Sequence, residues 1–84
     1  MGKFEKIIYK LLSGSSDTNF TFEELRTLLV SLYFEERKTS GSHRIFTKKG
    51  VVGIINLQRD KNNKAKPYQV KQVRDFLVKN KLLE

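Results

Sequence analysis

The spacing of apolar residues changes twice along this chain, and this change constrains the fold more than any other feature. Apolar residues recur every three or four positions in 3–12, 22–32 and 67–80, which is typical of helices with one buried face. Residues 33–57 hold short β-branched and aromatic runs separated by glycine turns, which predicts strands. The order α-α-β-β-β-α predicts an α+β fold with helices packed on one face of a three-stranded antiparallel sheet.

The second predicted helix carries the clearest local signal. Thr21 is followed three positions later by Glu24, which is the pattern of a capping box. Phe20 is placed to pack against Leu25 as a hydrophobic staple. Pro67 is expected at the first position of the last helix. We expect the buried faces of these two helices to consist of Phe22, Leu25, Leu28, Leu29 and Leu32, and of Val70, Val73, Phe76 and Leu77.

Three strands are predicted in the middle of the chain. They cover Tyr33–Thr39, His43–Thr47 and Val51–Leu57. The turns between them hold Gly41 and Gly50, and Gly53 suggests a bulge in the third strand. Because Ile45 and Phe46 are both apolar, alternation leaves open which face of the middle strand is buried.

Basic residues gather in the C-terminal half of the chain. Residues 1–36 contain 4 basic and 6 acidic side chains, a balance of −2, whereas residues 37–84 contain 13 and 3, a balance of +10. Such asymmetry favours a polyanionic partner for the C-terminal half. A charged surface that serves only solubility is the alternative.

Length and composition exclude several classes of protein. With 84 residues the chain is expected to form one domain over 1–84, with 1–16 as an N-terminal helical extension. The absence of cysteine excludes disulfides, thiol catalysis and cysteine-based zinc sites, and it fits a reducing cytoplasm. No apolar run approaches the ~20 residues of a membrane span, so we expect a cytoplasmic protein without a membrane partner.

The single histidine, His43, is the strongest candidate for catalysis. Histidine exchanges protons near neutral pH, and the preceding Gly41 and Ser42 form a turn that lets a ligand approach closely. We expect Arg44, Lys48 and Lys49, which lie in or beside the same hairpin, to stabilise a phosphate. A lone histidine in a small basic domain is nevertheless more often an ordinary surface residue.

A second basic element surrounds the start of the last helix. Lysines in an exposed loop beside a helix N-terminus suit phosphate contacts, although a charged helix face often serves only solvation. Tyr68 can stack on a base or pack the helix onto the sheet, and we favour packing. One histidine and few acids cannot make a standard metal site, so no metal or other cofactor is expected. The predicted RNA-binding residues of this element are Arg59, Lys61, Lys64, Lys66, Lys71 and Arg74.

Two segments give the chain a resemblance to the HicA toxin family. They are Gly41-Ser42-His43-Arg44-Ile45-Phe46, entering a strand, and the helix PYQVKQVRDFL at 67–77, which follows a basic loop. The similarity covers roughly residues 22–83, and the Gly-Ser-His segment is its most specific part. The resemblance implies a fold like that of a double-stranded-RNA-binding domain and a toxin endoribonuclease that cleaves mRNA without a metal. It also implies that His43 is catalytic and that a HicB-type antitoxin covers the site.

The chain departs from this family in one feature of the expected site. Many HicA-like proteins carry a second histidine in or after the third strand, where this chain has Ile55-Asn56-Leu57-Gln58. The acid for the leaving group is therefore unassigned, with Lys48 or a bound water as candidates. The missing histidine favours the alternative of a non-catalytic RNA-binding or protein-binding module of the same fold.

Overall fold

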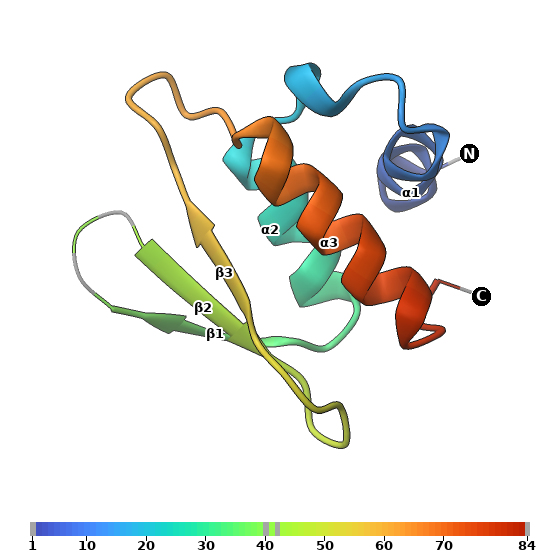
Figure 1. Cartoon of the computed structure of the whole chain (residues 1–84), viewed down its shortest axis with the longest axis vertical. Helices are drawn as coiled ribbons and strands as arrows, with labels where there is room; N and C mark the ends of the chain where they lie inside the picture. The colour runs from blue at the N-terminus through green and yellow to red at the C-terminus, as the bar shows by residue number, and fades with distance from the viewer. Residues whose placement is uncertain (1, 40, 42, 84) are drawn as a thin grey trace.

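In the computed structural model, which describes residues 2–39, 41 and 43–83, the last two helices pack on one face of a three-stranded antiparallel sheet, and the first helix packs against these two helices (Figure 1). This is the α+β arrangement predicted from the sequence, with the elements in the order α-α-β-β-β-α and the strands side by side in chain order. None of the helices formed by the described residues has the length and apolar character of a membrane span. The elements are α1 (Lys3–Ser13), a short 3-10 turn η1 (Asp17–Asn19), α2 (Phe22–Ser31), β1 (Glu35–Lys38), β2 (His43–Thr47), β3 (Ile55–Gln58) and α3 (Pro67–Lys79).

One apolar core lies between the helices and the sheet. Helix α1 contributes Ile7 and Leu11 to it, so the segment predicted as an extension packs against the rest of the chain. The predicted faces of α2 and α3 are buried, except that Leu32 and Phe76 are half-buried at the edge of the core. The other core residues are Phe20, Phe34, Phe46, Ile55, Leu57 and Ala65.

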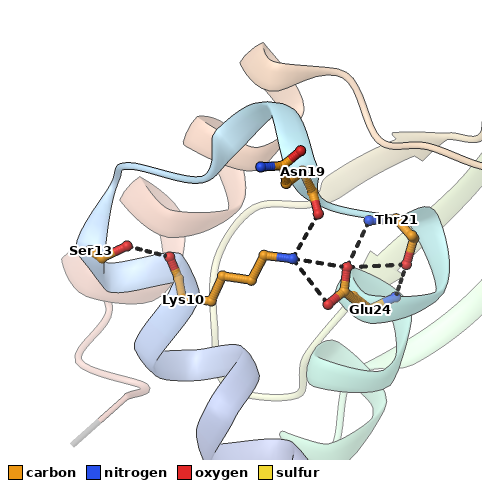
Figure 2. Close-up of polar contacts among 5 residues, drawn as sticks. All are labelled: Lys10, Ser13, Asn19, Thr21 and Glu24. Carbon is orange, nitrogen blue, oxygen red and sulfur yellow. Dashed lines mark hydrogen bonds and ion pairs between the residues drawn. The ribbon is translucent and has the colours of Figure 1, made fainter.

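A polar network joins α1 to the start of α2 (Figure 2). The capping box predicted at Thr21 forms: the Thr21 side chain accepts from the Glu24 N–H, and the Glu24 carboxylate accepts from the Thr21 N–H at 2.9 Å. The Lys10 ammonium donates to the Asn19 carbonyl at 2.7 Å and to both Glu24 oxygens at 3.2 and 3.3 Å. It also lies 4.5 Å from the centroid of the Phe20 ring. One lysine therefore holds the first two helices together where the core begins.

Strand pairing decides which face of β2 is buried. Phe46 is opposite Ile55 and both are fully buried, so these side chains point toward the helices. Because side chains alternate along a strand, Arg44 shares this inner face, whereas His43 and Ile45 lie on the outer face. The pairing thus resolves the ambiguity that two neighbouring apolar residues left in the sequence.

The first strand begins later than predicted, at Glu35 rather than Tyr33. Tyr33 has a positive φ of 69° and lies just past the end of α2. The Phe34 N–H donates to the Leu29 carbonyl and the Tyr33 N–H to the Val30 carbonyl, which is a Schellman motif. The strand-forming propensity of an aromatic residue is overridden because the helix end needs this left-handed position.

The third strand also begins later than predicted, at Ile55 rather than Val51. Val52 is 94% exposed, and residues 51–54 belong to the long turn between β2 and β3. Gly53 has a φ of 110° and lies against the Phe76 ring, so it is a turn residue rather than a bulge. The β-branched side chains of Val52 and Ile54 are thus exposed in a turn and do not pair in the sheet.

Candidate functional site

His43 is the first residue of β2 and lies half-buried on the outer face of the sheet. Its partner across the sheet is Gln58, at the end of β3. The His43 carbonyl accepts from the Thr39 N–H at 3.3 Å, toward β1, so His43 and Gln58 form a pair without mutual hydrogen bonds. Side chains approach most closely in such pairs. Gly41, with a φ of 60°, forms the turn before the histidine as predicted, and Ser42 lies outside the described residues.

A hollow of about 260 Å³ opens beside the imidazole, between the sheet and the first turns of α3. We call it the His43 hollow. Its walls come from β2, β3 and α3, so elements that are distant in sequence meet at the histidine. Among the residues that the structure describes, no Asp, Glu, Lys or Arg lines it; the lining residues are His43, Asn56, Gln58, Tyr68, Gln69 and Gln72.

Gln69 fixes the position of α3 against the edge of the sheet. Its side chain is only 4% exposed. With its carboxamide oriented to satisfy both partners, the amide nitrogen donates to the Gln58 carbonyl and the amide oxygen accepts from the Gln58 N–H, each at 3.2 Å. The side chain thereby occupies the hydrogen-bonding positions of a further strand. We did not predict this residue, although its spacing from Val73 and Phe76 places a polar residue on the buried stripe of the helix.

The Arg44 side chain lies on the opposite face of the sheet from the His43 side chain, and its guanidinium donates to the His43 carbonyl at 3.1 Å and to the Gly41 carbonyl at 3.3 Å. Its guanidinium is 3.5 Å from the Glu36 carboxylate and its side chain is 16% exposed. Glu36 also accepts from Arg26 of α2 at 2.8 Å, and this hydrogen bond raises the pKa of Arg26 above its ordinary value. The three charges join α2 to the inner face of the sheet. Arg44 therefore supports the packing of the sheet, and the structure does not bring it to the His43 hollow as we had predicted.

Lys48 and Lys49 are separated from His43 by the length of β2. Five residues of strand span roughly 17 Å, and the turn after β2 lies at the other end of the sheet from the turn that precedes His43 (Figure 1). Lys48 donates to the Leu32 carbonyl at 2.7 Å, at the end of α2, and Lys49 is exposed. Lys48 is thus unsuited to protonate a leaving group beside His43, contrary to the role suggested from the sequence.

Two of the predicted arginines are engaged in contacts within the protein. Arg74 donates to both Asp17 oxygens at 2.8 and 3.1 Å and to the Leu11 carbonyl at 3.2 Å. The hydrogen bond with Asp17 raises the pKa of Arg74 above its ordinary value. Arg59 lies 5.4 Å from the centroid of the Phe22 ring. Arg74 therefore connects α3 to η1, and Arg59 covers the start of α2.

Four of the predicted lysines remain exposed near the start of α3. Lys61, Lys64 and Lys66 belong to the loop between β3 and α3, residues 59–66, and Lys71 is in the second turn of the helix. The loop joins the end of β3, which holds Gln58, to the helix that carries Tyr68 and Gln69. The lysines of the loop are therefore carried by a segment that joins two walls of the His43 hollow.

The β3–α3 loop has a defined backbone despite its polarity. The Asp60 carboxylate accepts from the N–H groups of Asn62 and Lys64 at 2.8 Å each, and the bond from Lys64 is the main cause of a lowered Asp60 pKa. The Phe22 N–H donates to the Asn63 carbonyl, and the Ala65 N–H donates to the Phe20 carbonyl. These bonds attach the lysine-bearing loop to the start of α2, so the lysines extend from a fixed base.

Tyr68 projects from α3 rather than packing onto the sheet. It is 63% exposed and borders the His43 hollow, so our prediction that it packs the helix was wrong. Over residues 2–39, 41 and 43–83, no group of three or more His, Asp or Glu side chains has a geometry that could hold a metal ion.

No protein-family model, curated protein or solved structure matches the chain. Its function must therefore be inferred from the residues of the His43 hollow and their surroundings.

Proposed function

We propose that this protein is a HicA-type toxin endoribonuclease that binds mRNA and cleaves it without a metal, with His43 as the catalytic residue. One observation carries the proposal: the only histidine is half-buried in a polar hollow beside a loop of exposed lysines. Proton transfer on a phosphodiester requires a histidine on a fixed strand that is reachable from solvent, with cations in the surrounding loops to contact the phosphates. The Gly-Ser-His resemblance to HicA toxins points to the same chemistry.

RNA carries its own nucleophile, so one base is sufficient to start the reaction. The imidazole of His43 takes the proton of a ribose 2′-hydroxyl, and the 2′-oxygen forms a bond to the adjacent phosphorus. The bond from phosphorus to the 5′-oxygen breaks, and water in the open hollow protonates that oxygen. The products are a 2′,3′-cyclic phosphate and a 5′-hydroxyl. DNA, which lacks the 2′-hydroxyl, is not a substrate.

The exposed lysines supply the electrostatic part of the mechanism. Lys61, Lys64, Lys66 and Lys71 hold phosphates on either side of the scissile bond, which positions the ribose at His43. Charges that build on the phosphate oxygens are stabilised by the same ammonium groups. Arg44 and Lys48 act only through the fold.

The test is cleavage of a long mRNA in EDTA by the purified protein beside His43→Ala. We expect cleavage by the wild type alone, with 2′,3′-cyclic phosphate ends, while the variant keeps its circular dichroism spectrum and its affinity for RNA. Cleavage by His43→Ala at the wild-type rate would contradict the catalytic role, and so would a loss of cleavage explained by lost RNA binding.

A non-catalytic RNA-binding or protein-binding module is the second candidate. It is favoured by the composition of the hollow, whose described wall residues offer one imidazole, one phenol and otherwise carboxamides. On this hypothesis His43 donates a hydrogen bond to a phosphate. Wild-type protein that binds RNA but leaves it intact in the same assay would support it.

In the cell, we place the activity in the cytoplasm, where mRNA is available. A HicB-type antitoxin that covers the His43 hollow is the partner that such a toxin needs. Growth arrest on expression of the wild type, absent for His43→Ala and relieved by the product of a neighbouring reading frame, would support this part of the proposal.

A further inference from the structure

The lining of the His43 hollow differs in chemistry from its surroundings. Lysines lie on the β3–α3 loop and on α3, but the described wall residues carry amide, imidazole and phenol groups. The hydrogen bonds of the described residues leave the carboxamides of Asn56, Gln58 and Gln72 without a protein partner, and Asn56 and Gln72 are exposed. A phosphate-binding site would hold cations at this position, so the hollow suits a part of the RNA other than its phosphates.

Carboxamides and an aromatic ring are the groups that recognise a nucleobase. A carboxamide presents one donor and one acceptor side by side and can pair with the edge of a base through two hydrogen bonds. An exposed tyrosine offers a face on which a base stacks. Tyr68 and Gln72 extend from neighbouring turns of α3, and Asn56 and Gln58 face them from β3.

We propose that the His43 hollow is a recognition subsite for one unpaired nucleobase of a single-stranded RNA. The base stacks on Tyr68, and the carboxamides of Asn56, Gln58 and Gln72 contact its edge, while the lysines outside hold the phosphates. This inference rests on the proposed function for its substrate class, and it assigns the choice of nucleotide to residues other than His43. The position of the base in the hollow brings its ribose to the imidazole.

The first test measures binding without cleavage. Homopolymeric 2′-O-methyl oligonucleotides of A, C and U, which lack the free 2′-hydroxyl, are titrated into the wild type and into His43→Ala. We expect both proteins to prefer one base over the others by about tenfold. Equal affinity for all three homopolymers in both proteins would overturn the subsite, whatever the outcome of the cleavage assay.

Variants of the hollow separate stacking from charge. Tyr68→Leu should lose about tenfold in affinity for the preferred oligonucleotide, and Tyr68→Phe should keep it, because only the ring face is needed. Gln72→Ala should reduce the difference in affinity between the homopolymers, with little change in affinity for the homopolymer that binds most weakly. Tyr9→Leu is the matched control, since Tyr9 is an exposed tyrosine on α1, away from the hollow. An effect of Tyr9→Leu equal to that of Tyr68→Leu would contradict the assignment.

Mapping of cleavage sites then tests the subsite on a long RNA. We expect wild-type cuts to cluster beside one type of nucleotide, and Gln72→Ala to spread them over all four. Cuts that are clustered for the wild type and unchanged in Gln72→Ala and Tyr68→Leu would overturn the inference while leaving the catalytic role of His43 intact. Conversely, base preference in binding without any cleavage would retain the subsite and reject the ribonuclease.

Discussion

Gly53 is a residue whose identity is dictated by a neighbour distant in the sequence. Its φ of 110° is rarely adopted by other residues, and a Cβ atom there would lie 3.1 Å from Cε2 of Phe76. The sequence shows only a glycine within a β-branched run. The structural reason for it, a turn pressed against the ring of α3, depends on packing that no local pattern encodes.

Replacement of Gly53 by alanine tests this contact. We expect Gly53→Ala to lower the free energy of unfolding by about 2–4 kcal/mol, because backbone strain and overpacking against Phe76 add. Gly50→Ala is the control: Gly50 has a φ of 85° but nothing within 4 Å of the added Cβ, so strain alone should cost about 1 kcal/mol. Urea denaturation measures the free energy of unfolding of both variants. Equal losses would show that the Phe76 ring moves aside without an energetic cost.

Asp60 makes the β3–α3 loop sensitive to acid. Backbone hydrogen bonds, chiefly from Lys64, lower the pKa of its carboxyl below the ordinary value of 3.8. A lowered pKa means that the ionised form stabilises the folded loop above pH 3.8, and that this contribution is lost as the pH falls through the folded pKa.

We therefore expect amide protection of Asn62 and Lys64 to fall in acid, below the pH at which an unfolded aspartate titrates. Hydrogen exchange followed by NMR measures it. In Asp60→Asn the protection of these amides should no longer depend on protonation at this position. A wild-type loop whose protection does not change below pH 3.8 would contradict the role of the carboxylate.

At the scale of elements, α3 is attached to the sheet by one buried side chain as well as by apolar packing. Gln69 satisfies the backbone of Gln58 at the edge of β3, next to His43. The position of the helix relative to β3 thus depends on a polar contact in a largely apolar interface. Buried polar groups that lose their partners are costly, which gives this contact more influence than its two hydrogen bonds suggest.

Gln69→Leu should lower the free energy of unfolding by about 1–3 kcal/mol, because it leaves the N–H and carbonyl of the half-buried Gln58 without these partners. Gln72→Ala, at an exposed position of the same helix, should change it by less than about 0.5 kcal/mol. Thermal and urea unfolding of the two variants provide the measurement. A Gln69→Leu protein as stable as the wild type would show that the edge is satisfied in another way.

The predictability of the elements follows their physical origin. Helix positions were predicted because capping and apolar spacing are local, as at Thr21 and along α3. The starts of β1 and β3 were not predicted correctly, because Tyr33 lies at the C-terminal end of α2 and Val52 lies in the turn between β2 and β3. Similar limits apply to the site. His43 could be singled out as the lone histidine, but the internal partners of Arg44, Lys48 and Arg74 depend on tertiary contacts.

At the scale of the whole molecule, exposed charge is distributed unevenly between the two ends of the sheet. Lys61, Lys64 and Lys66 lie on the β3–α3 loop, whereas Lys49 lies on the turn between β2 and β3 at the other end (Figure 1). Under the proposed function, RNA bound at the His43 hollow contacts the first group and not the second. The 17 basic side chains of the chain thus exceed the number available to one ligand.

The salt dependence of RNA binding distinguishes the two ends. Each phosphate contact contributes about 0.7 to the slope of log affinity against log salt for a single strand. We expect Lys61→Gln combined with Lys66→Gln to reduce the slope by about 1.4, and Lys49→Gln to leave it unchanged. Fluorescence anisotropy at several salt concentrations measures the slopes. A reduction by Lys49→Gln as large as that for each loop lysine would place the RNA across both ends.

The side chains of His43 and Arg44 point to opposite faces of the sheet, and this limits which insertions and deletions the gene for this protein can tolerate. Insertion or deletion of one codon within 43–47 reverses the side to which every later side chain of the strand points. An insertion or deletion between His43 and Arg44 would take Phe46 out of the core and break the pair of Arg44 with Glu36, so the fold would be lost. Insertion or deletion of two codons leaves every later side chain on its original face of the sheet, and a change of any length in the turns does the same. Viable length variants are therefore expected in the turns and, in the strand, only in even steps.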